Sequence, residues 1–130
     1  MNLQPQHSPY PTIEAIYAVG HYLLEQERPA DAVKVFRVML HAAPRDERAW
    51  LGLGRCHEQV GHPRIALEVY GAGSVVAGPS ARCEVARGRV LRALDRDDEA
   101  AAAFERAAEL ADTSNQDDLA ALVSREARAS

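Results

Sequence analysis

The stretch WLGLGRCHEQVG, residues 50–61, contains three glycines whose spacing could belong to a phosphate-binding loop. Such a loop follows a β-strand, opens onto the N-terminus of a helix and, in the Walker form, carries a lysine and a hydroxyl residue. The sequence around Gly52, Gly54 and Gly61 has none of these features. The glycines fit the interior and the end of a helix instead, so the sequence argues against nucleotide binding.

Cys56, His57 and Cys83 carry side chains that zinc prefers, but their spacing fits no standard zinc motif. Cys56 and His57 are adjacent, so on one helix they would point in different directions. Buried thiols and a packed or half-buried imidazole are the more common outcome. The spacing also gives no serine a His–Asp pair that would activate it as a nucleophile. We therefore expect no metal, no cofactor and no enzymatic activity.

A period of 34 residues indicates the elements that position these side chains. Three columns share this period: Gly20, Gly54 and Gly88; Ala32, Ala66 and Ala100; and Phe36, Tyr70 and Phe104. Thirty-four residues is the length of the tetratricopeptide repeat, a pair of antiparallel helices in which small residues allow close packing. The sequence resembles this repeat over residues 13–46, 47–80 and 81–112. It therefore predicts an all-α solenoid of three helix-turn-helix repeats.

The third repeat and the two flanks depart from the repeat pattern. Glu84 and Arg87 occupy positions that are usually apolar, which predicts a rotated or loosely packed first helix in that repeat. Residues 1–12 read as a flexible N-terminal arm that ends at Thr12, the expected N-cap of the first helix. Residues 113–130 follow a turn and form a capping helix and tail with a narrow apolar stripe, as expected of a helix that seals a solenoid.

Composition limits the function further. A chain of 130 residues is long enough for one domain, and a net charge of −4 argues against nucleic-acid binding. The sequence has no signal peptide and no apolar run long enough to span a membrane, so we expect no membrane insertion. Two cysteines suit a reducing cytoplasm, and fourteen arginines against one lysine suggest a bacterial source.

The first helices of successive repeats are expected to line a concave surface. Ten residues of these helices form columns across it: Tyr17, Leu51 and Val85; Arg48 and Arg82; His21, Arg55 and Arg89; Leu24 and Arg92. Apolar pockets beside guanidinium groups suit an extended peptide, because arginine donates directional hydrogen bonds to carbonyl and carboxylate oxygens. The columns predict a peptide-binding groove.

The segments DAVKVFRVML, RAWLGLGRCHEQVG and ALEVY, taken together, resemble the class II chaperones of bacterial type III secretion systems. The resemblance covers residues 13–112 and is best in the first two repeats. It implies a cytoplasmic chaperone whose groove holds a short extended segment of a secreted hydrophobic translocator and keeps that client soluble and competent for export. By position, the client's apolar anchors would meet Tyr17, His21, Leu24, Leu51 and Arg55.

Several alternatives stay open at this point. Members of that family usually carry a dimerising helix before the first repeat, whereas this chain has an arm with three prolines, so a monomer and a homodimer both remain open. A second function is a chaperone of the polymerising needle subunit, which would bind an amphipathic helix. A third is a general adaptor that reads an acidic C-terminus through the arginine columns. An enzyme is the weakest alternative.

Overall fold

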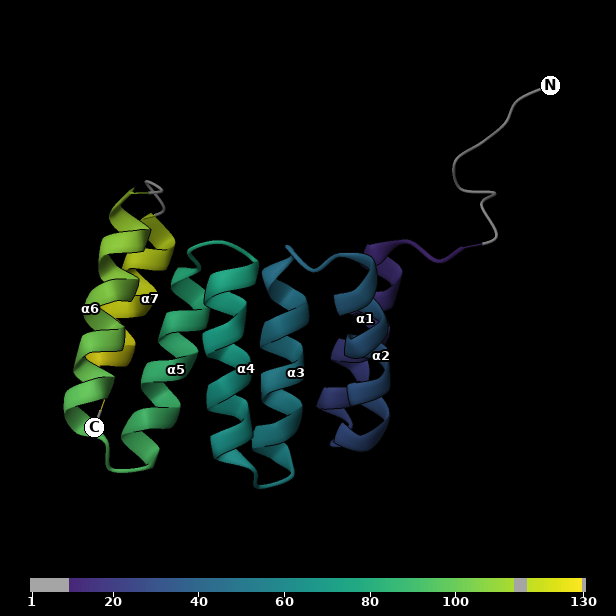
Figure 1. The fold of residues 1–130 in the computed structure, drawn as a ribbon, viewed down its shortest axis with the longest axis horizontal. Helices are drawn as coiled ribbons and strands as arrows, with labels where there is room; N and C mark the ends of the chain where they lie inside the picture. Colours follow the sequence, from purple (N-terminus) through teal and green to yellow (C-terminus); the bar gives the residue numbers. More distant parts are fainter. Residues whose placement is uncertain (1–9, 114–116, 130) are drawn as a thin grey trace.

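A computed structural model of the chain describes residues 10–113 and 117–129, which form helices joined by short turns and contain no strand. Figure 1 shows the helices side by side in chain order, from α1 and α2 at one end to α6 and α7 at the other. Their bounds are α1 Ile13–Glu25, α2 Pro29–Ala42, α3 Glu47–Gln59, α4 Pro63–Val76, α5 Ala81–Ala93, α6 Asp97–Thr113 and α7 Asp117–Arg128. Each helix packs on the next, and α1, α3, α5 and α7 also contact one another in turn. The expected all-α solenoid is confirmed.

The starts of the helices repeat with the 34-residue period. Thr12, Asp46 and Ser80 are the N-caps of α1, α3 and α5, and each side chain accepts a hydrogen bond from a backbone N–H two or three residues later, at 3.0–3.1 Å. These bonds satisfy amide groups that have no partner inside the helix. Pro29 and Pro63 stand at the first positions of α2 and α4, where the missing N–H costs nothing. The predicted cap at Thr12 is confirmed.

The turns inside the three helix pairs share one backbone conformation. Glu27, Gly61 and Asp95 are again 34 residues apart, and their φ angles of 54°, 79° and 60° lie in the left-handed region. A residue in this conformation ends a helix by letting the following N–H groups bond back to its last carbonyls. Gly61 therefore turns the chain, as its place at the end of the WLGLGRCHEQVG stretch predicts.

The glycines inside the helices make room for aromatic rings of neighbouring helices. Phe36 of α2 lies against both Gly20 of α1 and Gly52 of α3, and an added Cβ at Gly20 would stand only 2.7 Å from Phe36 Cζ. Gly54 of α3 faces the fully buried ring of Tyr70 in the same way. The WLGLG glycines are thus packing positions in the middle of a helix, which confirms the interpretation drawn from the sequence.

The expectation of a loosely packed first helix in the third repeat is wrong. Helix α5 is largely buried, and the Glu84 side chain is among the buried groups, at 4% exposed. Its carboxylate lies 3.1 Å from Arg87 Nη1 on the next turn and 3.7 Å from Arg106 Nε on α6. A buried carboxylate is tolerated when cations and hydrogen bonds compensate it. The two polar residues therefore form an ion pair that allows α5 to pack closely.

The C-terminal helix covers one end of the stack. Leu119 and Val123 of α7 are buried against α5 and α6, and Arg92 of α5 donates a hydrogen bond to the carbonyl oxygen of Glu126 at 2.8 Å. Helix α6 continues to Thr113, and the rest of the expected turn, 114–116, lies outside the described residues, as does most of the expected N-terminal arm. A search of the described helices finds none that is both long and apolar enough to cross a membrane.

Candidate peptide-binding groove

A concave pocket of about 270 Å³ runs across the first helices of the three pairs. We call it the groove. Its lining residues are Tyr17, His21, Leu24, Phe36, Arg48, Leu51, Gly52, Arg55, Tyr70, Arg82, Val85, Ala86, Arg89, Leu122 and Glu126. The structure therefore brings nine of the ten residues singled out in the sequence to one surface. That a peptide binds there remains a prediction.

Tyr17 forms one wall of the groove and is held by cationic and aromatic neighbours. The Arg48 guanidinium lies 4.7 Å from the centre of the Tyr17 ring, and the His21 ring stacks beside it with centroids 5.8 Å apart. Phe36 meets the same ring edge-on at 6.4 Å. Cation–π and aromatic contacts of this kind each contribute about 0.5–1.5 kcal/mol. Tyr17 is thus a rigid, half-buried apolar surface facing the groove.

Leu24 and Val85 contribute to the floor of the groove and expose little surface. Leu24 is 3% exposed and Val85 is 4% exposed, because both pack into core clusters. Leu24 lies on the concave side, as its column predicts, but it offers a ligand almost no surface. Leu51 is only half-buried and lies between the two in the row of first helices. Tyr17 and Leu51, together with the half-buried Leu122 of α7, supply the apolar surface that a ligand can reach.

Three of the four arginines in the groove already hold a carboxylate of this chain. Arg48 makes a bidentate pair with Glu14, at 2.8 and 3.0 Å, and also bonds Asp46. Arg82 lies 3.3 Å from Glu47, and Arg89 lies 3.0 Å from Glu58. Within residues 10–113 and 117–129, Arg55 makes no ion pair or hydrogen bond through its side chain.

The ion pairs set the charges around the groove. Hydrogen bonds from Arg48 hold the pKa of Asp46 and of Glu14 below their ordinary values, so both carboxylates are charged at neutral pH. Burial raises the pKa of Tyr70, and its hydrogen bond to Glu58 raises it further. The Tyr70 hydroxyl therefore stays protonated and donates to the Glu58 carboxylate, which also accepts from Arg89.

Arg92 lies outside the groove. Its guanidinium stacks 5.1 Å from the centre of the Phe104 ring, bonds the Glu126 carbonyl and lines a separate hollow beside Asp95. The reason is the last helix: α7 occupies the end of the concave side, and Arg92 holds it to α5.

Sequence reasoning missed six residues that line the groove. They are Phe36, Gly52, Tyr70, Ala86, Leu122 and Glu126. Glu126 had a signal that could have found it, because it stands one further period of 34 after Leu24, Glu58 and Arg92. Phe36 and Tyr70 belong to the periodic aromatic column, and both line the groove although they expose almost no surface.

The residues considered for zinc lie apart from the groove. Cys56 and Cys83 are both fully buried, and burial raises the pKa of each thiol to about 11. His57 is half-buried and its Nδ1 is a buried atom without a hydrogen-bond partner; burial, followed by the charges of His62 and Arg37, lowers its pKa. The described part of the chain gathers no three ligands suited to a metal ion.

Part of the sequence that forms the groove matches a known repeat family. A family model described as "Tetratricopeptide repeat" matches residues 23–75, from the end of α1 to the end of α4. Helices α5 and α6, which follow that match, continue the same packing and the same period. The fold of the chain is therefore an all-α tetratricopeptide-repeat solenoid. No curated protein matches its sequence significantly.

Among solved structures, the chain is similar to translocator chaperones of type III secretion. PcrH, known from Pseudomonas aeruginosa, in complex with the chaperone binding region of PopB is 26% identical with a TM-score of 0.76, over 96% of this chain and 98% of that chain. The translocator chaperone SycD of Yersinia enterocolitica is also 26% identical, with a TM-score of 0.79, over 89% of this chain and 87% of that chain. SycD in complex with a peptide of the translocator YopD is 26% identical, with a TM-score of 0.74, over 95% of this chain and 94% of that chain. The resemblance noted in the sequence to class II chaperones is confirmed.

Proposed function

We propose that this protein is a cytoplasmic chaperone of a bacterial type III secretion system that binds an extended segment of a hydrophobic translocator in the groove. One observation carries the proposal: a groove with reachable apolar surface at Tyr17 and Leu51, in a fold similar over nearly its whole length to chaperones solved with translocator segments. The groove presents apolar surface and guanidinium groups, which suits holding a peptide and not reacting with it.

The mechanism is mass action. A translocator segment exposes apolar side chains that would otherwise drive aggregation or premature insertion into a membrane. A binder that engages the exposed segment lowers the concentration of free client by a factor set by its affinity. The extended form of the client matters, because successive side chains of a strand point in opposite directions, so a short chain laid across the first helices can direct alternate side chains to one row of groove residues. Tyr17 and Leu51 would receive the apolar side chains.

The first test is co-expression of this protein with each protein encoded beside it, followed by capture on a tag. We expect recovery of a protein with long apolar segments. Recovery of a short helical needle subunit instead would overturn the proposal in favour of a needle chaperone. Recovery of a client whose acidic C-terminus is required for capture would favour the general adaptor.

The groove itself is tested with Leu51→Glu, which places a carboxylate in the middle of the apolar row. We expect client capture to fall by more than about tenfold, because a charged group cannot be desolvated against an apolar anchor. Val38→Glu is the matched control, since Val38 of α2 is 56% exposed and lies outside the groove. Tyr17→Ala provides a second variant. If these groove variants bind as wild type, or if both unfold the protein, the assignment of the groove is wrong.

A further inference from the structure

The groove carries its charges in a row beside its apolar surface. His21, Arg55 and Arg89 occupy equivalent positions on α1, α3 and α5, one helical turn beyond Tyr17, Leu51 and Val85. At one end of the row, His21 Nε2 lies 2.6 Å from Glu25. At the other end, Arg89 is paired with Glu58. The residue between them, Arg55, is the member of the row that holds no carboxylate among the described residues.

Arg55 also stands where the groove meets a second, polar hollow. Arg55 and Arg89 line both spaces, and the remaining lining of the second hollow is Glu58 and Gln59. Among the described residues, neither Glu58 nor Gln59 is bonded to the Arg55 side chain. The Glu58 carboxylate is engaged by Tyr70 and Arg89, and the Gln59 amide donates to the carbonyl of Leu24 at 3.1 Å. The Arg55 guanidinium therefore faces the ligand side with its donors available.

We infer that the client segment carries an aspartate or glutamate directly beside the apolar side chain that packs on Tyr17 and Leu51, and that Arg55 binds this carboxylate. This inference rests on the proposed function. Every other arginine in the groove is matched to a carboxylate, so the unmatched one selects the same chemistry from the ligand. An ionised acceptor bonds a guanidinium about twice as strongly as a neutral peptide carbonyl does, and it can engage two donors at once.

The separation of Leu51 and Arg55 suits two neighbouring side chains of one extended peptide. Leu51 and Arg55 are four residues apart on α3, which separates them by about 6 Å along the helix axis. Neighbouring side chains of an extended peptide point to opposite edges of its backbone. A peptide that crosses the three first helices can therefore direct one side chain to the Leu51 row and the next to the Arg55 row.

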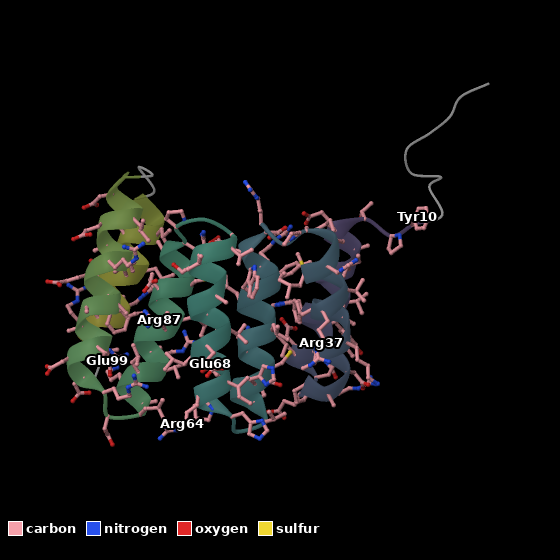
Figure 2. The ribbon with its side chains drawn as sticks, in the orientation of Figure 1. Tyr10, Arg37, Arg64, Glu68, Arg87 and Glu99 are labelled. Carbon is pink, nitrogen blue, oxygen red and sulfur yellow. The ribbon has the colours of Figure 1, made fainter. Side chains whose placement is uncertain are left out.

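The test is selection of a phage-displayed library of random decapeptides on the full-length protein, in three forms: wild type, Arg55→Gln and Arg64→Gln. Arg64 is the matched control, because it is exposed on α4, lines no part of the groove and its change removes the same charge (Figure 2). We expect wild type and Arg64→Gln to enrich peptides that pair an apolar residue with an adjacent acid. Arg55→Gln should enrich apolar peptides without the acid.

The strength of the contact is then measured by fluorescence anisotropy with a selected peptide and its amide counterpart, in which the acid is replaced by asparagine or glutamine. Wild type should bind the amide form about five- to tenfold more weakly, as for a charge-assisted bond at a partly exposed site, and Arg55→Gln should bind both forms alike. Raised salt should narrow the difference for wild type.

The outcomes separate this inference from the function on which it rests. If all three forms select the same apolar peptides without an acid, or if the acid preference survives Arg55→Gln, the inference is overturned while groove binding stands. If the selected peptides bind Leu51→Glu as tightly as wild type, they do not use the groove, and both the proposed function and the inference fail.

Discussion

The contact between Gly54 and Tyr70 predicts that Gly54→Ala destabilises the protein, although alanine is the better helix former. A Cβ at this position would stand 2.7 Å from Tyr70 Cδ1 and closer still to the neighbouring ring carbon. The ring cannot move aside, because it is fully buried and its hydroxyl is bonded to Glu58. Overpacking a rigid core costs about 1–3 kcal/mol, and here we take the upper end.

Helix propensity offsets part of that cost. Replacing a helical glycine by alanine gains about 1 kcal/mol, so the net loss in the free energy of unfolding is about 2 kcal/mol. For a chain of this length, that loss lowers Tm by about 7 °C. Thermal and urea unfolding followed by far-UV circular dichroism measure both quantities, provided that the unfolding is reversible and the urea m-value is unchanged.

Gly71→Ala is the matched control on α4. A Cβ at Gly71 would have its nearest neighbour outside its own helix 3.6 Å away, at Nε of the flexible Arg87 side chain, so only the gain in helix propensity remains. We expect this variant to be more stable than wild type, by up to about 1 kcal/mol. The two substitutions should therefore change stability in opposite directions. A Gly54→Ala protein that is as stable as wild type, or more stable, would refute the packing argument.

Three further predictions concern titration and backbone geometry. Hydrogen bonding from Arg48 lowers the pKa of Asp46 from its ordinary 3.8. The charged Asp46 carboxylate therefore stabilises the folded protein fully above pH 3.8, and this stabilisation is lost as the pH falls through the folded-state pKa. The urea midpoint of Asp46→Asn should fall less than that of wild type between neutral pH and about pH 2.5, and an equal fall would contradict a stabilising role of the Asp46–Arg48 contact. With pKa values of about 11, Cys56 and Cys83 should resist a thiol reagent at neutral pH and react fully in urea; rapid reaction of the native protein would show that the thiols are accessible. Glu27 adopts the left-handed conformation that favours glycine, so Glu27→Gly should raise the free energy of unfolding by about 1 kcal/mol; a loss on urea unfolding would show that its side chain holds the turn.

The sequence predicted the fold well wherever one residue type fills one structural position. The glycine, alanine and aromatic columns are visible because close packing demands the same side chain each time. The caps beyond Thr12 were not predicted, because threonine, aspartate and serine all serve as caps. The turn at Gly61 was predicted, but its likeness to the turns at Glu27 and Asp95 was not, because these residues share a φ angle without sharing a side chain. A backbone conformation that recurs in each repeat is therefore harder to recognise in the sequence than a side-chain volume that recurs.

The sequence predicted which residues lie along the candidate groove, but it did not predict how deeply their side chains are buried. Periodicity places Leu24 on the concave side, but it does not say how deeply the side chain is buried, and Leu24 is 3% exposed. Contacts between side chains of different helices also could not be predicted from the periodicity. Glu84 seemed misplaced on α5 because its second cation, Arg106, comes from another helix, and Arg92 is drawn out of the groove by α7.

The double use of Phe36 has a consequence for cooperativity. Its ring fills the space left by Gly20 within the first helix pair and by Gly52 at the junction with the second. In a nearest-neighbour description of repeat arrays, each repeat has an intrinsic free energy and each junction an interfacial one. One ring that contributes to both makes the two terms inseparable, so α1, α2 and α3 should open to hydrogen exchange as a single unit. Because Phe36 also lines the groove, a bound peptide would slow exchange across that whole unit.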